Sequence, residues 1–187
     1  MQLANNEELD TFLKIHPSIK MMEVLMIDMN GIIRCKRIPR SEFAELFTEG
    51  LKSPASTVLL NVKGEFCDEL DKADLDGDPD RLIRPIKNTL SIIPWLESET
   101  AQVLSTFTEL NGEPNLFDSR NVLINSLKPL YALGLKLVVA TELEFYLIKK
   151  GDSTRPEPLL SKIPGTNRDQ SGSQYAMPED LWDHDQF

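Results

Sequence analysis

The sequence predicts an α+β fold, and three observations support this. An Asn30-Gly31 pair separates two apolar runs, which is the strongest short-range signal for a β-hairpin. Residues 101–108 form another apolar strand candidate in the same half of the chain. A helical pattern at residues 119–133 then leads into an apolar run at residues 135–148, a helix–strand unit that differs in character from the β-rich first half.

The first half is expected to contain two short helices and five strands. Asn6 and Ser41 are the expected N-caps of the helices, because their side chains can accept a hydrogen bond from a free backbone N–H. Pro17 and Gly50 are expected to end them. The helices are expected at residues 6–15 and 42–47, and the strands at residues 21–29, 32–38, 56–62, 89–94 and 101–108.

In the second half, the expected helix at residues 119–133 has the clearest end signals. Asp118 stands at the N-cap position and Gly134 at the C-cap position. The break at residues 111–114, Asn-Gly-Glu-Pro, is the expected boundary between two domains, residues 1–112 and 113–187.

The composition indicates a globular protein that does not bind nucleic acid. Of 187 residues, 41% are hydrophobic and 27% charged, and the net charge is −10. Phosphate neutralisation needs clustered cations, which this acidic chain lacks. The longest basic run, Arg34 to Arg37, is read as a solvated edge strand rather than a phosphate-binding patch, because strand alternation divides it between two faces.

No targeting or membrane segment is expected. The first ten residues are polar and acidic, unlike a signal peptide, and no apolar stretch approaches the ~18 residues of a spanning helix. Two cysteines, Cys35 and Cys67, imply no disulfide framework. The expected location is the cytoplasm.

Two carboxylates, Glu142 and Glu144, are the candidate metal ligands. On one strand, residues two apart share a face, so the two carboxylates are expected about 7 Å apart. Their mutual repulsion would be relieved by a divalent cation, and carboxylate oxygens suit Mg²⁺ or Mn²⁺. The alternative is the solvent-exposed end of an edge strand, because Glu-x-Glu is a common pattern.

Several segments, taken in order, resemble the N-terminal portion of the glutamine synthetase family. The resemblance is greatest to its γ-glutamylputrescine and γ-glutamylpolyamine synthetase-like branch. It covers nearly the whole chain, and it rests on the order and spacing of the segments rather than on any single motif. The segments are residues 24–31 with 34–39, 78–80, 89–95, 112–114 with 118–120, 142–145 and 174–187.

This resemblance implies a fold and an activity. It implies an N-terminal β-grasp domain at residues 1–112, followed at 113–187 by the beginning of a catalytic α/β domain, an incomplete open β-barrel. The family activity is an ATP-dependent glutamate–ammonia or glutamate–amine ligation through γ-glutamyl phosphate, with Mg²⁺ or Mn²⁺ between ATP and glutamate. The implied partners are glutamate and ammonia or an amine such as putrescine, in a homo-oligomer.

The resemblance also implies roles for three residues. Glu142 and Glu144 match the family's Glu-x-Glu strand, whose carboxylates belong to two different metal sites. Asn61 stands where the family places an acid, on a loop that reaches the neighbouring subunit's active site and helps to deprotonate ammonium. Asn cannot accept a proton at neutral pH, so this chain departs from the family at that position.

The chain ends before the family's remaining metal glutamates, its glutamate-binding arginine and its phosphate-binding basic residues. The expected function is therefore that of a ligase fragment, inactive as the isolated chain. Two alternatives remain open: a non-catalytic regulatory or assembly module, and a pseudoenzyme in which Glu142 and Glu144 are relics.

Overall fold

The computed structural model describes residues 1–65, 77–145, 147–151, 154–160, 162–163 and 165–169. The chain divides into two compact units, Met1–Leu137 and Val138–Phe187. The first unit contains all the named helices and strands of the described residues. The acidic segment 174–187, which contributed to the family resemblance, lies outside the described residues.

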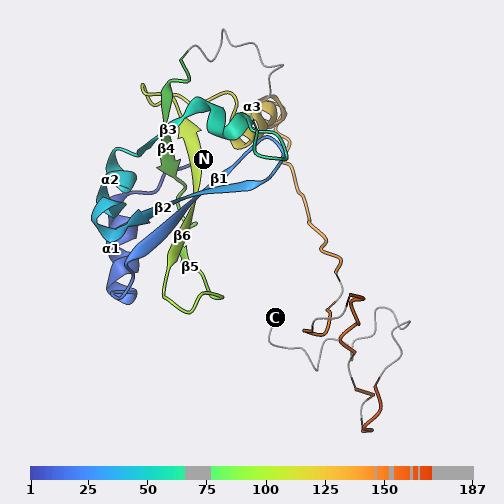
Figure 1. The fold of residues 1–187 in the computed structure, drawn as a ribbon. Helices are drawn as coiled ribbons and strands as arrows, with labels where there is room; N and C mark the ends of the chain where they lie inside the picture. Colours follow the sequence, from blue (N-terminus) through green and yellow to red (C-terminus); the bar gives the residue numbers. More distant parts are fainter. Residues whose placement is uncertain (66–76, 146, 152–153, 161, 164, 170–187) are drawn as a thin grey trace. The chain divides into compact units, whose positions relative to one another are not determined.

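A mixed sheet forms the centre of the first unit (Figure 1). Its strand order is β2-β1-β6-β4-β3, with β5 paired to β6 off this path. Strands β1 and β2 form the predicted antiparallel hairpin, and β1 runs parallel to β6. The strands are β1 (Met21–Ile27), β2 (Ile33–Pro39), β3 (Leu51–Pro54), β4 (Asp80–Pro85), β5 (Ser91–Ile92) and β6 (Ala101–Thr108).

Strand β6 connects the two halves of this sheet. Its residues 101–104 pair with β1, and its residues 105–108 pair with β4. Strand β5 pairs with the first two residues of β6. The partners of β6 change halfway along the strand, and the sheet curls there. With its helices and this mixed sheet, the fold is an α+β architecture, as predicted.

Helices α1 (Asn6–Ile15) and α2 (Phe43–Thr48) contact each other and supply side chains to the hydrophobic core (Figure 1). The burial of β1 alternates strictly, because successive side chains of a strand point to opposite faces. The buried side chains of β1 therefore pack against those of the helices and of β6. The fully buried side chains, each less than 2% exposed, include Met22, Val24, Phe43, Leu46, Val103 and Phe107.

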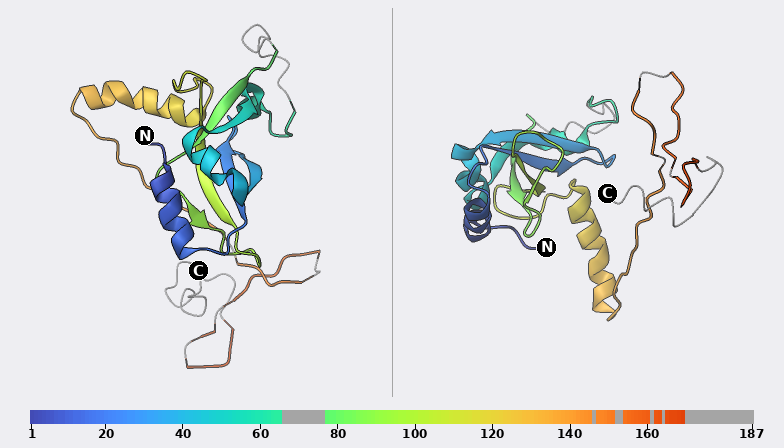
Figure 2. Two further views of the ribbon diagram at one scale, coloured as in Figure 1. Left: turned by 90° about the vertical axis from the view of Figure 1, so that its left-hand side faces the viewer. Right: turned by 90° about the horizontal axis from the view of Figure 1, so that it is seen from below.

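Helix α3 (Ser119–Ala132) has a different environment. Asn121 is its one buried residue, and the helix extends away from the sheet beyond its first turn (Figure 2). Several of its apolar side chains are exposed, among them Val122, Leu123 and Tyr131. The predicted helix at residues 119–133 is thus confirmed, and within the first unit its buried contact lies at the N-terminal end.

Two predicted elements of the first half were wrong. Residues 56–62 are not a strand, because residues 55–59 form a 3₁₀ helix and the strand precedes it as β3. The buried residues Ala55, Val58 and Leu59 have spacings of three and four, which favour a helical turn over an alternating strand. The predicted strand at 89–94 shrinks to β5.

The helix ends also differ in part from the prediction. Asn5, not Asn6, caps α1, since its Oδ1 accepts from the Glu8 N–H at 3.2 Å. A 3₁₀ turn at Arg40–Glu42 precedes α2, which begins without a side-chain cap. Gly50 ends α2 as predicted, with φ of 85°.

Among the glycines that the structure describes, Gly50 has the sharpest steric constraint. A Cβ atom there would stand 2.5 Å from Arg84 Cδ and 2.8 Å from the Ile83 carbonyl oxygen. We expect Gly50→Ala to lower the free energy of unfolding by about 2–4 kcal/mol, from left-handed strain plus overpacking. The matched control is Gly31→Ala, since Gly31 also has positive φ but no atom within 4 Å of such a Cβ. Urea denaturation should show the smaller loss for Gly31→Ala, and equal losses would contradict the steric explanation.

Candidate functional site

The Asn61 side chain closes a tight turn. Its Oδ1 accepts hydrogen bonds from the backbone N–H groups of Lys63 at 2.9 Å and Glu65 at 3.0 Å. The Asn61 N–H donates to the Glu65 carbonyl at 2.8 Å, and the Gly64 N–H donates to the Asn61 carbonyl at 2.9 Å. Asn is well suited to this position because its side chain can accept from the N–H two residues ahead.

The remaining polar atom of the Asn61 side chain points to a carboxylate. Asn61 Nδ2 donates to Glu65 Oε2 at 3.2 Å, and the Glu65 side chain is exposed. Both ends of the Asn61 amide are therefore engaged within residues 61–65, which we call the Asn61 turn. In this arrangement, Asn61 organises the turn and orients Glu65.

An ion pair lies within the β1–β2 hairpin, between Asp28, directly after β1, and Arg34 on β2. Asp28 is 1% exposed, and its Oδ2 accepts from Arg34 Nε at 2.9 Å and lies 2.8 Å from Arg34 Nη2. Its Oδ1 accepts from the N–H groups of Asn30 and Ile32, both at 2.9 Å. Burial alone would raise the pKa of Asp28, but these N–H donors and the guanidinium together hold that pKa below its usual value.

The same hairpin holds the segment that leads into the Asn61 turn. Arg34 Nη2 donates to the Asn61 carbonyl at 3.2 Å, and Asn30 Nδ2 donates to the Leu60 carbonyl at 2.7 Å. The Met29 N–H donates to the Val58 carbonyl at 3.0 Å. We call Asp28, Asn30 and Arg34 the turn clamp, because their contacts connect the hairpin to the Asn61 turn.

Sequence reasoning did not identify the turn clamp. It assigned Arg34 to a solvated basic run, whereas the Arg34 side chain is only 24% exposed and pairs with the buried Asp28. The available signal was Asp28, a single charged residue directly after an apolar strand and beside a tight turn. A carboxylate that becomes buried at such a position requires a partner, which predicts a nearby cation.

Glu142 and Glu144 lie in the second unit, and both are exposed. The predicted strand at residues 135–148 is wrong for the described part of that range, where the structure has no strand and a single bridge joins Ile148 to Pro158. A strand needs backbone partners, and none of the described residues pairs with residues 138–145. The one-face arrangement of the two carboxylates therefore remains a prediction.

Glu142 and Glu144 have the right chemistry for metal ligands, but two carboxylates are too few to complete a metal site. Carboxylate oxygens suit Mg²⁺ or Mn²⁺. Among the described residues, however, no group of three His, Cys, Asp or Glu side chains is close enough together to hold an ion. The described structure therefore provides no complete metal site.

A buried polar network attaches the start of α3 to β6. Asp118 Oδ1 accepts from the Arg120 N–H at 2.9 Å, as an N-cap does. Its Oδ2 accepts from the Thr106 hydroxyl at 2.8 Å and from the Phe107 N–H at 2.7 Å. Asn121 Nδ2 completes the network by donating to the Phe107 carbonyl at 3.0 Å.

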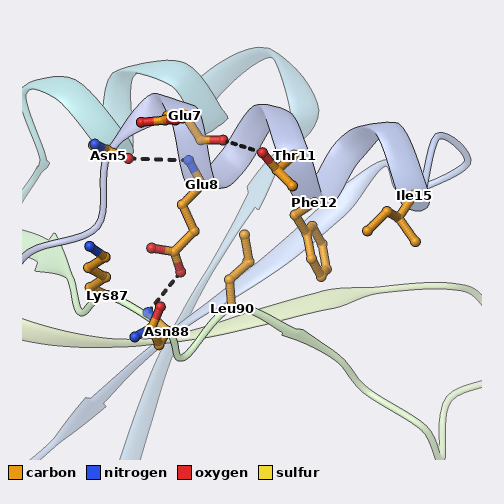
Figure 3. Close-up of a pocket in the computed structure, with 9 residues that line it drawn as sticks. All are labelled: Asn5, Glu7, Glu8, Thr11, Phe12, Ile15, Lys87, Asn88 and Leu90. Atoms are coloured by element: carbon orange, nitrogen blue, oxygen red, sulfur yellow. Dashed lines mark hydrogen bonds between the residues drawn. The ribbon is translucent and has the colours of Figure 1, made fainter.

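An open pocket of about 540 Å³ lies between α1 and residues 87–90 (Figure 3). Glu8 Oε1 accepts from the Asn88 N–H across it at 2.9 Å, and Phe12 and Leu90 line its apolar part. The pocket contains none of the predicted site residues. The Glu8–Asn88 hydrogen bond connects α1 to the segment between β4 and β5.

Comparison with known proteins reveals the ancestry of this chain. The chain is 31% identical over 178 residues to γ-glutamylputrescine synthetase PuuA of Escherichia coli (strain K12), which covers 95% of this chain. It is 33% identical over 124 residues to a glutamate–isopropylamine ligase of a Pseudomonas species. It is also 27% identical over 151 residues to a glutamine synthetase of Mycolicibacterium smegmatis.

The chain belongs to the glutamine synthetase family. The resemblance deduced from the ordered motifs is thereby confirmed, although no family model matches the sequence. The match covers 38% of PuuA, 27% of the isopropylamine ligase and 30% of the Mycolicibacterium enzyme, so the chain spans well under half the length of these glutamine synthetase relatives. No helix in the described part of the chain is long and apolar enough to cross a membrane.

Proposed function

We propose that this chain is the N-terminal part of an ATP-dependent glutamate–ammonia or glutamate–amine ligase that acts through γ-glutamyl phosphate. The observation that carries the proposal is the similarity to γ-glutamylputrescine synthetase along 95% of the chain. The glutamate–isopropylamine ligase adds a second relative whose name describes an amine acceptor. An amine such as putrescine is therefore the favoured co-substrate, with ammonia as the alternative.

We further propose that residues 1–112 are a β-grasp domain and that residues 113–187 begin the catalytic domain. A central parallel pair, β1 and β6, with antiparallel neighbours supports the first assignment. The boundary falls at a turn directly after β6, where Gly112 has φ of 86°. The exposed apolar side chains of α3 support the second assignment, because a helix with such side chains is typical of an element that packs against further polypeptide.

In this proposal, Glu142 and Glu144 are ligands of two Mg²⁺ or Mn²⁺ sites, and the other ligands come from polypeptide outside these 187 residues. The bound ions would neutralise phosphate charge during phosphoryl transfer. The Asn61 turn faces the incoming ammonia or amine, at the active site of a neighbouring subunit in a homo-oligomer. The proposed compartment is the cytoplasm, on the basis of the low cysteine content.

The isolated chain is expected to be inactive, because its described residues assemble no complete metal site. The test is phosphate release from ATP in the presence of glutamate and putrescine, isopropylamine or ammonia. We expect no turnover above background from the purified 187-residue chain and clear turnover from a complete ligase subunit that contains it. Turnover by the 187-residue chain would overturn the fragment assignment. An inactive complete subunit would favour the alternative, a non-catalytic regulatory or assembly module.

A further inference from the structure

We propose that Glu65 is the proton acceptor for the incoming amine and that Asn61 is its positioning residue. The inference rests on the proposed ligase function. It begins with the hydrogen bond between Asn61 Nδ2 and Glu65 Oε2, at 3.2 Å. It assigns a catalytic role to a residue for which the sequence motifs predicted none.

The proposed reaction needs a proton acceptor for a simple chemical reason. Alkylamines resemble the lysine side chain, whose pKa is ~10.4, so they are protonated at neutral pH and have no free lone pair. One proton must pass from the ammonium nitrogen to a carboxylate, giving a neutral amine and a carboxylic acid. The nitrogen lone pair then forms the C–N bond to the γ-carbonyl carbon, the C–O bond to phosphate breaks, and phosphate leaves with that electron pair. The nitrogen gives up a second proton as the amide forms, and the departing phosphate takes it up.

Asn61 cannot perform this step. An amide accepts no proton at neutral pH, and the Asn61 Oδ1 already accepts two backbone hydrogen bonds, from Lys63 and Glu65. Turning the Asn61 side chain toward a substrate would leave both N–H groups without this acceptor and open the turn.

Glu65 offers the exposed carboxylate that the step requires. Its backbone is held on both sides, since its N–H donates to Asn61 Oδ1 and its carbonyl accepts from the Asn61 N–H. Its side chain is exposed and accepts from the Asn61 amide through one oxygen, Oε2. A second carboxylate in the same network, Asp28, is buried and fully engaged by Arg34 and two N–H groups.

The Asn61 turn is also anchored well enough to position an acid. The turn clamp holds the Leu60 and Asn61 carbonyls through the side chains of Asn30 and Arg34. A catalytic group gains its advantage from being held in place by contacts formed before the substrate binds. The clamp supplies such contacts to the Asn61 turn.

The test compares the reaction rates of the complete ligase subunit with two nucleophiles, putrescine, which must lose a proton, and hydroxylamine, which need not. Glu65→Gln keeps the acceptor for Asn61 Nδ2 but removes the proton acceptor. We expect kcat with putrescine to fall about 10²–10⁴-fold, the usual contribution of a general base. Hydroxylamine is largely uncharged at neutral pH, so hydroxamate formation should stay within about twofold of wild type by the same reasoning. Glu97→Gln, at an exposed carboxylate in a different turn, is the matched control and should change neither rate.

A relocated carboxylate gives the second test. Adding Asn61→Asp to Glu65→Gln returns an acid to the turn, and we expect it to restore at least part of the putrescine-dependent rate. Equal loss with putrescine and hydroxylamine would show that Glu65 is merely structural and would overturn the inference. An unchanged putrescine rate in Glu65→Gln would also overturn it. A wild-type subunit that forms neither product would instead overturn the proposed function itself.

The geometry can be tested without any activity, in the 187-residue chain. The side-chain amide resonances of Asn61 should shift in Glu65→Ala, which removes the acceptor of the Asn61 Nδ2 hydrogen bond, and should stay unchanged in the Glu97→Ala control. Asn61 side-chain resonances that are the same in Glu65→Ala and in the wild-type chain would contradict the hydrogen bond on which the inference rests.

Discussion

Arg34→Gln is expected to lower the free energy of unfolding by about 3–5 kcal/mol, because it leaves the buried Asp28 carboxylate without its cation. Arg34 supplies two donors to Asp28 Oδ2 and a third contact to the Asn61 carbonyl. Glutamine has too short a side chain and too few donors to replace all three contacts. The measurement is urea denaturation followed by circular dichroism.

The matched control for this change is Arg37→Gln, on the same strand. Arg37 pairs with Glu23 at 3.4 Å, and its side chain is 53% exposed against 24% for Arg34. Exposed pairs contribute at most about 1 kcal/mol, so the control should be nearly neutral. Similar losses for the two variants would contradict the special role of the buried pair.

The Asp28 pair also predicts a pH dependence. Because the pKa of Asp28 is lowered in the folded state, its contribution to stability is fully present above the unfolded carboxyl pKa of about 3.9. That contribution is lost as the pH falls below this value and through the lower folded pKa. Asp28→Asn should therefore be destabilised at neutral pH, with a shallower loss of stability than wild type below about pH 4. Parallel stability curves for the two proteins would contradict this assignment.

Asp118→Ala is expected to have an effect of similar size, about 3–5 kcal/mol. The substitution removes the N-cap of α3, which contributes about 1 kcal/mol. It also leaves the Thr106 hydroxyl and the Phe107 N–H without their acceptor, each at about 1–3 kcal/mol. Asp118 is 5% exposed, so water does not readily replace these bonds.

Hydrogen exchange distinguishes a local loss of the Asp118 contacts between α3 and β6 from a general loss of stability. In Asp118→Ala, residues 119–132 of α3 should exchange faster than those of the β1–β2 hairpin, relative to wild type. Ser119→Ala, at the exposed neighbouring position, is the control and should change stability by less than about 0.5 kcal/mol. Uniform acceleration across the whole first unit would contradict a local anchoring role.

Elements with strong local signals were predictable from the sequence. The Asn30-Gly31 turn specified the β1–β2 hairpin, and the strand at residues 101–108 and the helix at residues 6–15 appear with the predicted bounds. Strand β4, Asp80–Pro85, was not predicted because half of its residues are charged, and burial of Ile83 depends on the neighbouring strands. Local pattern therefore failed where the neighbours decide what is buried.

For the candidate site, the ordered motifs indicated the family and identified Asn61 as a departure from it, and the comparisons bear out the family. The turn clamp could not be predicted from the motifs, because the Asp28–Arg34 pair exists only once the hairpin brings the two residues together. The Asn61–Glu65 bond likewise depends on a turn that closes on itself.

The sequence by itself determined the α+β class, the family and the identity of the candidate residues, because these follow from short-range patterns and their order. Only the tertiary structure decided which polar groups are buried together, since the pairing of Asp28 with Arg34 and of Asp118 with β6 depends on contacts across the sheet. The same contrast applies to Glu142 and Glu144. The sequence shows that their spacing suits one strand face, whereas a strand forms only when neighbouring segments satisfy its backbone hydrogen bonds.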